Sequence, residues 1–341
     1  MDLLPSPEQE GIVSSAAAFL AATLPPQRTR ELIDEPSNVD AEAWLAAADL
    51  GWFALGLPSD LGGVGCGLAD EVLLFREIGR SLAGGPFLAT TLAARVAAFG
   101  GDAQLGHEIS AGRQVGFGVL GPDSTLDPGG LAGTVHVVDG HDTDLVLVAT
   151  HERAGLFARA DLGGLVALEC IDPTARLARA TTRGAAPLVA VGADVDPVGL
   201  RGTVLVAALL TGIAEATAAL SAEHAKNRIQ FGRPIGVNQA VKHPCADMAV
   251  RAELAWAQVA VGALATDEAR ADAELQGLSA FVVAADAAER NAAATVQVLG
   301  GMGFTFEHDA NLYVKRAFLL TQLFGSVRLA LSRLVLLPGP L

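Results

Sequence analysis

Hydrophobic and polar positions divide the 341-residue chain into three patterns. Up to about residue 112 the pattern is helical, as in "SPEQEGIVSSAAAFLAATL", where Ser6 and Gln9 fit a capping box and Pro7 fits the first helical position. Short β-branched runs such as "TVHVV" and "DLVLVAT" follow, separated by Gly, Asp and Pro. This middle pattern predicts a small antiparallel sheet or barrel.

The helical pattern then returns in four long segments, which predict a four-helix bundle: 201–227, 239–270, 276–299 and 310–335. The fold class predicted from the whole pattern is a multi-domain α+β protein. Its expected parts are an N-terminal helical domain (1–112), a middle β domain (113–197) and a C-terminal four-helix bundle (198–341).

Composition supports this layout. Hydrophobic residues make up 51% of the chain and aromatic residues only 5%, so the interior is built mostly from Ala, Leu and Val, which favours closely packed helices. The most apolar run, from Thr203 to Leu220, has about the minimum length for a membrane span but carries Glu215. We therefore expect a buried bundle helix there.

A net charge of −15 argues against nucleic-acid and anionic-membrane partners, because the summed field repels polyanions. The start, "MDLLPSPEQE", is acidic and has no basic region, so a signal peptide is not expected. Cys66, Cys170 and Cys245 are odd in number and lack CxxC spacing. They are interpreted as reduced, packed thiols of a cytoplasmic protein without a metal site.

Two glycine-containing stretches carry candidate chemistry. In "AKNRIQFGRPIG", the cations Lys226, Arg228 and Arg233 surround a Phe-Gly turn at the end of a predicted helix. These cations either balance the helix dipole or clamp a phosphate group. In "QVLGGMGF", three glycines follow a helix, and a helix cap needs one. The surplus serves either close approach of a ligand or close helix packing.

These stretches and their surroundings resemble the acyl-CoA dehydrogenase family over nearly the whole chain. The motifs are "LGWFALGLPSDLGGVG", "EIGRSLAGGPFLATT", "NRIQFGRPIGVNQAVKHPCADM" and "VQVLGGMGFTFEHDANLYVKRA". The resemblance implies a helical domain, a β-barrel and a four-helix bundle, with FAD bound across subunit contacts in a tetramer built as a dimer of dimers. It also implies an acyl-CoA substrate and an electron-transfer flavoprotein as the electron acceptor.

The resemblance also assigns cofactor contacts. Arg228 is expected at the pyrophosphate or adenosine part of FAD, with Phe231 packed against that end and Gln239 nearby. The stretch that meets the same FAD from a neighbouring subunit is matched by Gln297, Gly300 and Gly301. Ser326 stands where the family has a Thr that hydrogen-bonds the cofactor.

The catalytic base of the family is missing at both positions where it is expected. In the family, a Glu in a Glu-Gly-Thr stretch removes the α-proton, but this chain reads Phe324-Gly325-Ser326. Some members place the Glu early in the first bundle helix, and that position falls on Gly202. Glu215 lies roughly 20 Å further along that helix, too far to substitute.

The middle domain, residues 113–197, departs from the family as well and is shortened relative to it. Of the family's flavin-covering stretch little remains beyond "LGPD", and the three tryptophans of the chain lie outside residues 115–197. The chain therefore resembles the base-lacking short subunit of a heteromeric acyl-CoA dehydrogenase, of the kind that actinobacteria use on steroid side-chain CoA thioesters. A catalytic partner subunit would supply the Glu in a heterotetramer. Two alternatives stay open: an autonomous homomeric enzyme with an unrecognised base, and a non-enzymatic structural relative.

Overall fold

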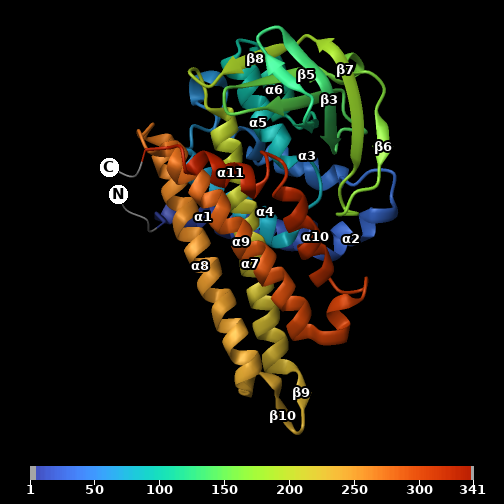
Figure 1. The fold of residues 1–341 in the computed structure, drawn as a ribbon, viewed down its shortest axis with the longest axis vertical. Helices are drawn as coiled ribbons and strands as arrows, with labels where there is room; N and C mark the ends of the chain where they lie inside the picture. Colours follow the sequence, from blue (N-terminus) through green and yellow to red (C-terminus); the bar gives the residue numbers. More distant parts are fainter. Residues whose placement is uncertain (1–4, 339–341) are drawn as a thin grey trace.

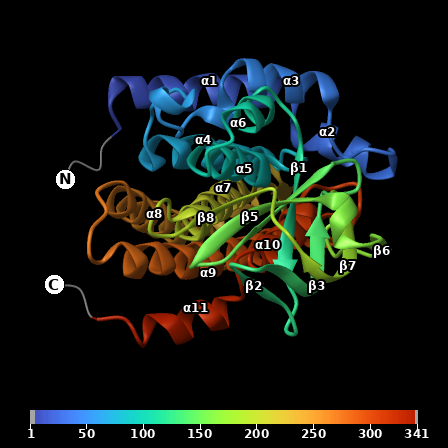
Figure 2. The ribbon, with the colours of Figure 1, turned by 90° about the horizontal axis from the view of Figure 1, so that it is seen from above.

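The computed structural model describes residues 5–338, which form an α+β fold with a sheet at one end of a long helical bundle (Figure 1). The expected order of helices, strands and helices is confirmed. Seen from above, the N-terminal helices lie along one side of the bundle, and the C-terminal helix α11 lies on the opposite side (Figure 2). The hairpin β9–β10 lies at the tip of the bundle, at the end away from the sheet (Figure 1).

The N-terminal part consists of α1 (Pro7–Thr23), α2 (Pro26–Glu31), α3 (Ala41–Asp49), α4 (Leu68–Ser81), α5 (Phe87–Phe99) and α6 (Ala103–Ser110), with short 3-10 turns η1 (Leu32–Asp34), η2 (Trp52–Ala54) and η3 (Ser59–Leu61). The expected capping box is present, because the Ser6 side chain accepts a hydrogen bond from the Gln9 N–H and the Gln9 side chain accepts one from the Ser6 N–H. Local sequence therefore determines where the first helix begins.

The middle part is a mixed sheet and not the antiparallel sheet or closed barrel that was expected. Its strands are β1 (Val115–Leu120), β2 (Thr125–Asp127), β3 (Gly130–Val138), β4 (Leu145–Ala149), β5 (Arg153–Ala158), β6 (Val166–Leu168), β7 (Leu177–Ala185) and β8 (Val189–Gly192), with the turn η4 (Arg159–Leu162). The path runs β6-β7-β3-β1-β4-β5-β8, with β2 paired to β3, and β1 pairs parallel to β4. The path leaves β6 and β8 as edges, so the sheet differs from the expected one in strand pairing, while the predicted fold class with a middle β domain is confirmed.

The C-terminal part is formed by α7 (Val198–Asn227), β9 (Ile229–Gln230), β10 (Arg233–Pro234), η5 (Ile235–Val237), α8 (Gln239–Asp267), α9 (Ala273–Leu299), η6 (Gly300–Phe304), α10 (Ala310–Leu320) and α11 (Val327–Leu334). The last predicted segment is therefore two helices. They are separated by a turn in which Gly325 has φ +90°, a conformation that favours glycine.

Helix α7 runs through the centre of the bundle. By length and composition, α7 and α8 could each cross a membrane, but 72% of the most apolar window of α7 is buried inside the fold. This burial confirms the expected bundle helix. Asn291 of α9 ties three helices together, because its side-chain amide donates to the carbonyl oxygens of Ala214 (3.0 Å) and Met248 (2.9 Å). Such buried bonds fix the register of an Ala-rich core that has few large side chains.

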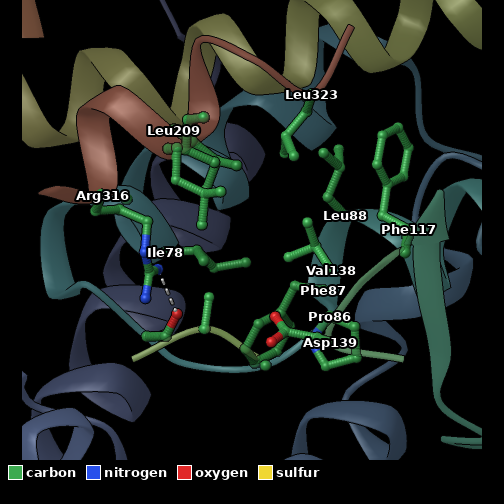
Figure 3. A pocket seen from close by; sticks show the side chains of 17 residues that line it. Ile78, Pro86, Phe87, Leu88, Phe117, Val138, Asp139, Leu209, Arg316 and Leu323 are labelled. Carbon is green, nitrogen blue, oxygen red and sulfur yellow. Dashed lines mark hydrogen bonds between the residues drawn. The ribbon is translucent and has the colours of Figure 1, made fainter. Parts of the chain in front are cut away.

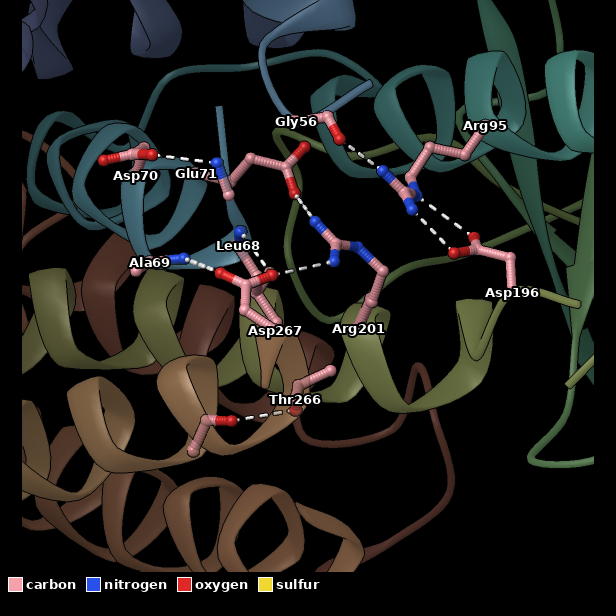
Figure 4. A network of polar contacts seen from close by, with 12 residues as sticks. Gly56, Leu68, Ala69, Asp70, Glu71, Arg95, Asp196, Arg201, Thr266 and Asp267 are labelled. Carbon is pink, nitrogen blue, oxygen red and sulfur yellow. Dashed lines mark hydrogen bonds and ion pairs between the residues drawn. The ribbon is translucent and has the colours of Figure 1, made fainter. Parts of the chain in front are cut away.

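Two buried arginines anchor the first turns of α7 to the N-terminal helices (Figure 4). Arg201 pairs with Glu71 of α4 at 2.6 Å and with Asp267 at the end of α8 at 3.3 Å. Arg95 of α5 donates two hydrogen bonds, of 3.0 and 2.6 Å, to the carboxylate of Asp196, which lies just before α7. Removing one partner of a buried pair leaves an uncompensated charge, so these contacts hold the start of α7 in one place.

Candidate functional site

The two positions singled out for a catalytic base meet in the structure. Gly202 lies in the second turn of α7, and Phe324 lies in the turn between α10 and α11. A Cβ built on Gly202 would lie 2.7 and 2.8 Å from Cε2 and Cε1 of Phe324, and closer still to Cζ. The phenyl ring therefore rests directly on the backbone of α7, and neither position carries a group that can accept a proton.

On its other side the Phe324 ring meets the sheet. Phe117 of β1 packs against it with ring centroids 5.1 Å apart and an interplanar angle of 56°. This tilted geometry is typical of favourable aromatic pairs. The two rings fill the space between the sheet and the bundle at this point.

A narrow apolar cavity lies beside this aromatic pair (Figure 3). Side chains from α4, α5, the sheet, α7 and α10 line it, including Ile78, Leu88, Phe117, Leu209 and Leu323. Its volume is about 70 Å³. Sites for drug-sized ligands measure roughly 300–1,000 Å³, and a cavity of about 150 Å³ admits benzene. The cavity is therefore too small for a bulky acyl chain.

Asp139, directly after β3, places a carboxylate in the wall of this cavity. One of its oxygens, Oδ1, accepts hydrogen bonds from the Asn38 amide and from the Arg176 N–H, both at 2.8 Å. Burial raises the pKa of Asp139, and these hydrogen bonds oppose the shift. Sequence reasoning missed this residue, since "VVDG" signals only a turn after a strand.

A second group in the wall is Arg316 of α10, which pairs with the buried Asp172 and donates to the carbonyl oxygen of Ala83. Nearby, the guanidinium of Arg176 donates to the carbonyl oxygens of Leu32 and Ile33. These contacts join the three parts of the chain around the cavity. The cavity wall is therefore braced by charged groups that already have partners.

The other candidate residues, apart from Ser326, lie toward the tip of the bundle. Arg228 caps the C-terminus of α7, and burial and the nearby charges of Arg228 and His308 lower the pKa of His224 one turn earlier. Next to the hairpin, a groove of about 330 Å³ is lined by Lys226 and Lys242. The tip thus gathers positive charge on a chain whose net charge is −15, which suits an anionic ligand.

Phe231 forms the hairpin turn with Gly232, and its side chain is 99% exposed. Both residues have positive φ, +51° and +78°, as a two-residue type I′ turn requires. Phenylalanine is costly in this conformation, where Asn and Gly are preferred. The backbone of Phe231 is strained and its ring is fully exposed. This combination points to a contact of the ring with another molecule.

The glycines after α9 have different roles. Gly300 has φ +63° at the helix cap, and a Cβ on Gly303 would meet the Val296 carbonyl oxygen at 2.8 Å. A Cβ on Gly301 would meet nothing within 4 Å. Helix capping and close packing therefore explain Gly300 and Gly303, while Gly301 leaves an open backbone that a ligand can approach.

The structure divides the expected cofactor residues into two groups. Gln239 and Gln297 are exposed, and with Arg228, Phe231, Gly300 and Gly301 they lie at the distal end of the bundle. Ser326 lies at the other end beside Phe324, where its side chain caps α11 by accepting from the Leu329 N–H at 3.3 Å. Along α7, Gly202 and Arg228 are about 39 Å apart, further than one dinucleotide cofactor reaches.

Comparisons with known proteins agree with this geometry. The acyl-CoA dehydrogenase N-terminal domain model matches residues 6–107, and the C-terminal domain model matches residues 201–333. The acyl-CoA dehydrogenase IpdE2 of Mycobacterium tuberculosis is 36% identical over 97% of this chain and 98% of its own length. The chain belongs to the acyl-CoA dehydrogenase family.

Two solved structures extend the comparison. The ChsE4–ChsE5 complex from Mycobacterium tuberculosis contains a chain that matches with a TM-score of 0.87 and 25% identity, over the full length of both chains. A variant of the Tcur3481–Tcur3483 steroid ACAD shares the fold, with a TM-score of 0.81 and 24% identity over 97% of each chain. The family relationship therefore includes proteins solved as two-component assemblies.

FAD is the cofactor of the acyl-CoA dehydrogenase family, and the residues of this chain fit it only in part. Exposed cations and the open backbone at Gly301 suit a pyrophosphate at the tip. At the other end, the Phe117–Phe324 pair occupies the space between the sheet and the bundle. This acyl-CoA dehydrogenase chain therefore has an exposed basic surface at one end and a closely packed region around Phe324 at the other.

We predict that Phe231→Asn leaves the stability of the chain unchanged or raises it by up to about 1 kcal/mol, because Asn tolerates positive φ and the ring has no packing to lose. Urea denaturation of the wild type and the variant measures this difference. A loss of more than about 1 kcal/mol would mean that the ring packs on its own chain. Phe157→Ala, which empties a buried position in the sheet, is the control expected to lose about 3–5 kcal/mol.

Proposed function

We propose that this chain is the non-catalytic subunit of a heteromeric, FAD-dependent acyl-CoA dehydrogenase. Its partner subunit supplies the catalytic Glu and most of the pocket for the flavin ring. The chain supplies the distal bundle surface and phosphate contacts from Arg228, Gln297, Gly300 and Gly301. The observation that carries the proposal is the contact of Phe324 with Gly202, because both base positions of the family meet there without a carboxylate.

The reaction needs a base at the α-carbon of the thioester and an acceptor for the hydride that leaves the β-carbon. FAD, when bound, accepts that hydride. This chain contributes binding to the step. Arg228 donates charge-assisted hydrogen bonds to a phosphate, and the open backbone at Gly301 leaves room for a cofactor group to approach. Ser326 is already used as a helix cap, so we assign it no part in the shared site.

The length of α7 supports a shared site. Because Gly202 and Arg228 are about 39 Å apart, the tip and the filled end belong to two different cofactor sites. If the tip completes a cofactor site of another subunit, it still contributes to cofactor binding when this chain's own site is lost. One chain of the ChsE4–ChsE5 complex matches this chain over its full length. This supports a heteromeric assembly, which we take to be a heterotetramer.

The apolar surface of the distal bundle fits such an assembly. Exposed apolar side chains include Phe231, Leu254, Phe304 and Phe306. Patches of this kind mark interaction surfaces, and aromatic side chains are enriched in them. We assign the surface to the catalytic partner and expect the complex to be cytoplasmic.

For the substrate we propose a bulky acyl-CoA, of the steroid side-chain type indicated by the family resemblance. Losing one of two equivalent sites leaves room for a substrate too large for a symmetric tetramer. A solved steroid ACAD has the same fold. This supports our proposal that the fold can serve a substrate of that size. The electron acceptor we propose is an electron-transfer flavoprotein.

A second candidate is an autonomous dehydrogenase whose base is Asp139. The observation in its favour is a buried carboxylate with a raised pKa in the cavity wall. Two observations oppose this candidate. Oδ1 of Asp139 already accepts two hydrogen bonds, and the cavity of about 70 Å³ does not admit an acyl chain. A non-enzymatic relative is the third possibility. A relative that binds no cofactor has no use for the exposed cations at the tip, so we do not prefer it.

Arg228→Ala is predicted to weaken FAD retention in the complex by roughly 10- to 150-fold, the effect of losing a charge-assisted hydrogen bond of about 1.5–3 kcal/mol. Flavin release on dilution and the melting temperature are measured on the same samples. Arg290→Ala is the matched control, since Arg290 is an exposed arginine on α9 that pairs only with Asp286 on its own helix. Equal flavin affinity in both variants would refute a phosphate role for Arg228.

Removal of the partner's catalytic Glu is predicted to slow flavin bleaching by substrate by about 100- to 10,000-fold, as for a lost general base. Asp139→Asn is predicted to leave the bleaching rate of the folded complex within a few-fold of wild type. Stopped-flow absorbance reads both variants, and the melting temperature confirms folding. A collapse of bleaching in Asp139→Asn, with the partner's Glu dispensable, would favour the autonomous enzyme.

A further inference from the structure

Phe324 and Gly202 lie so close together that the loss of a catalytic base alone does not explain their contact. A missing base needs only a side chain that cannot accept a proton, and a small residue is sufficient. Here the ring lies where any side chain on residue 202 would begin, with Cε1 and Cε2 within 2.8 Å of an added Cβ. Real Cβ atoms do not come so close to a ring, so the ring and a side chain at position 202 exclude each other.

Both sides of this contact are held by neighbouring groups, although the Phe324 ring is partly exposed. The backbone of α7 is fixed by Arg201, which pairs with Glu71 and Asp267 (Figure 4). The next residue, Thr203, donates its hydroxyl to the Gly199 carbonyl oxygen at 2.8 Å. Across the ring, Phe117 of the sheet packs at 5.1 Å between centroids. The ring is therefore held between an anchored helix and a strand.

The narrow cavity is lined by two neighbours of the ring, although the ring itself is not part of the lining. Phe117, which packs on the ring, lines the cavity, and so does Leu323, the residue before Phe324 (Figure 3). Removing the ring would extend the apolar space toward α7. We therefore expect Phe324 to limit the apolar space through its contacts with Phe117 and Gly202.

We propose that Gly202 and Phe324 form a coupled plug that closes this chain's own acyl pocket. Phe324 excludes an apolar acyl chain by its volume, and position 202 is glycine because the ring needs that space. The chain's own site is then closed by shape as well as by the missing base, and the acyl-CoA is directed to the partner's site. The direction of acyl-CoA to the partner's site rests on the proposed function. The plug itself rests on the geometry of one chain.

A double-mutant cycle tests the coupling in the chain as it purifies, together with its partner where one copurifies. Gly202→Ala alone is expected to lower the melting temperature by roughly 3–10 °C, because the methyl group overpacks the ring. In the Phe324→Ala background the same substitution is expected to be neutral or to raise the melting temperature, since Ala favours helix over Gly. A neutral Gly202→Ala, or equal losses in both backgrounds, would overturn the plug.

Phe157→Ala is the control background. Phe157 has the same side chain and is fully buried, whereas Phe324 is partly buried, and Phe157 belongs to the separate core within the sheet. There Gly202→Ala should lower the melting temperature as much as in the wild type, because distant sites add independently. Coupling of the same size with Phe157 would reveal general destabilisation and would contradict a specific pair.

Benzene provides a direct readout of the opened space. Phe324→Ala is expected to show a benzene-dependent rise in melting temperature that is absent from the wild type and reduced when Gly202→Ala is added. Absence of the rise in a folded Phe324→Ala variant would show that the ring closes no pocket. That outcome would leave the proposed heteromeric function standing, since it tests neither the partner nor flavin binding.

Discussion

The rigid length of α7 is the constraint on which the rest of the account depends. With 30 residues the helix is about 45 Å long, and its start is anchored to α4, α5 and α8 by buried ion pairs. One end therefore carries the contact between Gly202 and Phe324, and the other end carries the basic hairpin. Because a continuous helix keeps its two ends apart, our proposal assigns them to different cofactor sites.

The two ends have opposite physical character. Around Gly202 the chain is tightly packed, its charges are paired, and the cavity of about 70 Å³ leaves little room. Around Arg228 the side chains are exposed, cations gather, and Phe231 keeps a costly backbone conformation. Packing that closes one end and exposure that keeps the other end available are what a subunit needs when it completes a site but no longer contains one.

Much of this arrangement could be predicted from the sequence, because its signals are local or belong to recognisable motifs. The capping box at Ser6 and the buried run of α7 follow from residue periodicity and composition. The meeting of Gly202 with Phe324 depended on the family resemblance, since no periodicity links positions so far apart. The parallel pairing of β1 with β4 was missed, because strand pairing depends on long-range contacts. Asp139 was missed for the same reason, since its burial comes from Asn38 and Arg176 in other segments.

The central claim is that this chain completes a flavin site without containing one, and a flavin count tests it most directly. The chain is produced alone and also with a full-length relative that keeps the Glu, and FAD per polypeptide is measured by absorbance after denaturation. The account predicts a flavin-poor, poorly soluble chain alone and a yellow complex with fewer flavins than subunits. A soluble homotetramer of this chain carrying one FAD per polypeptide would contradict it.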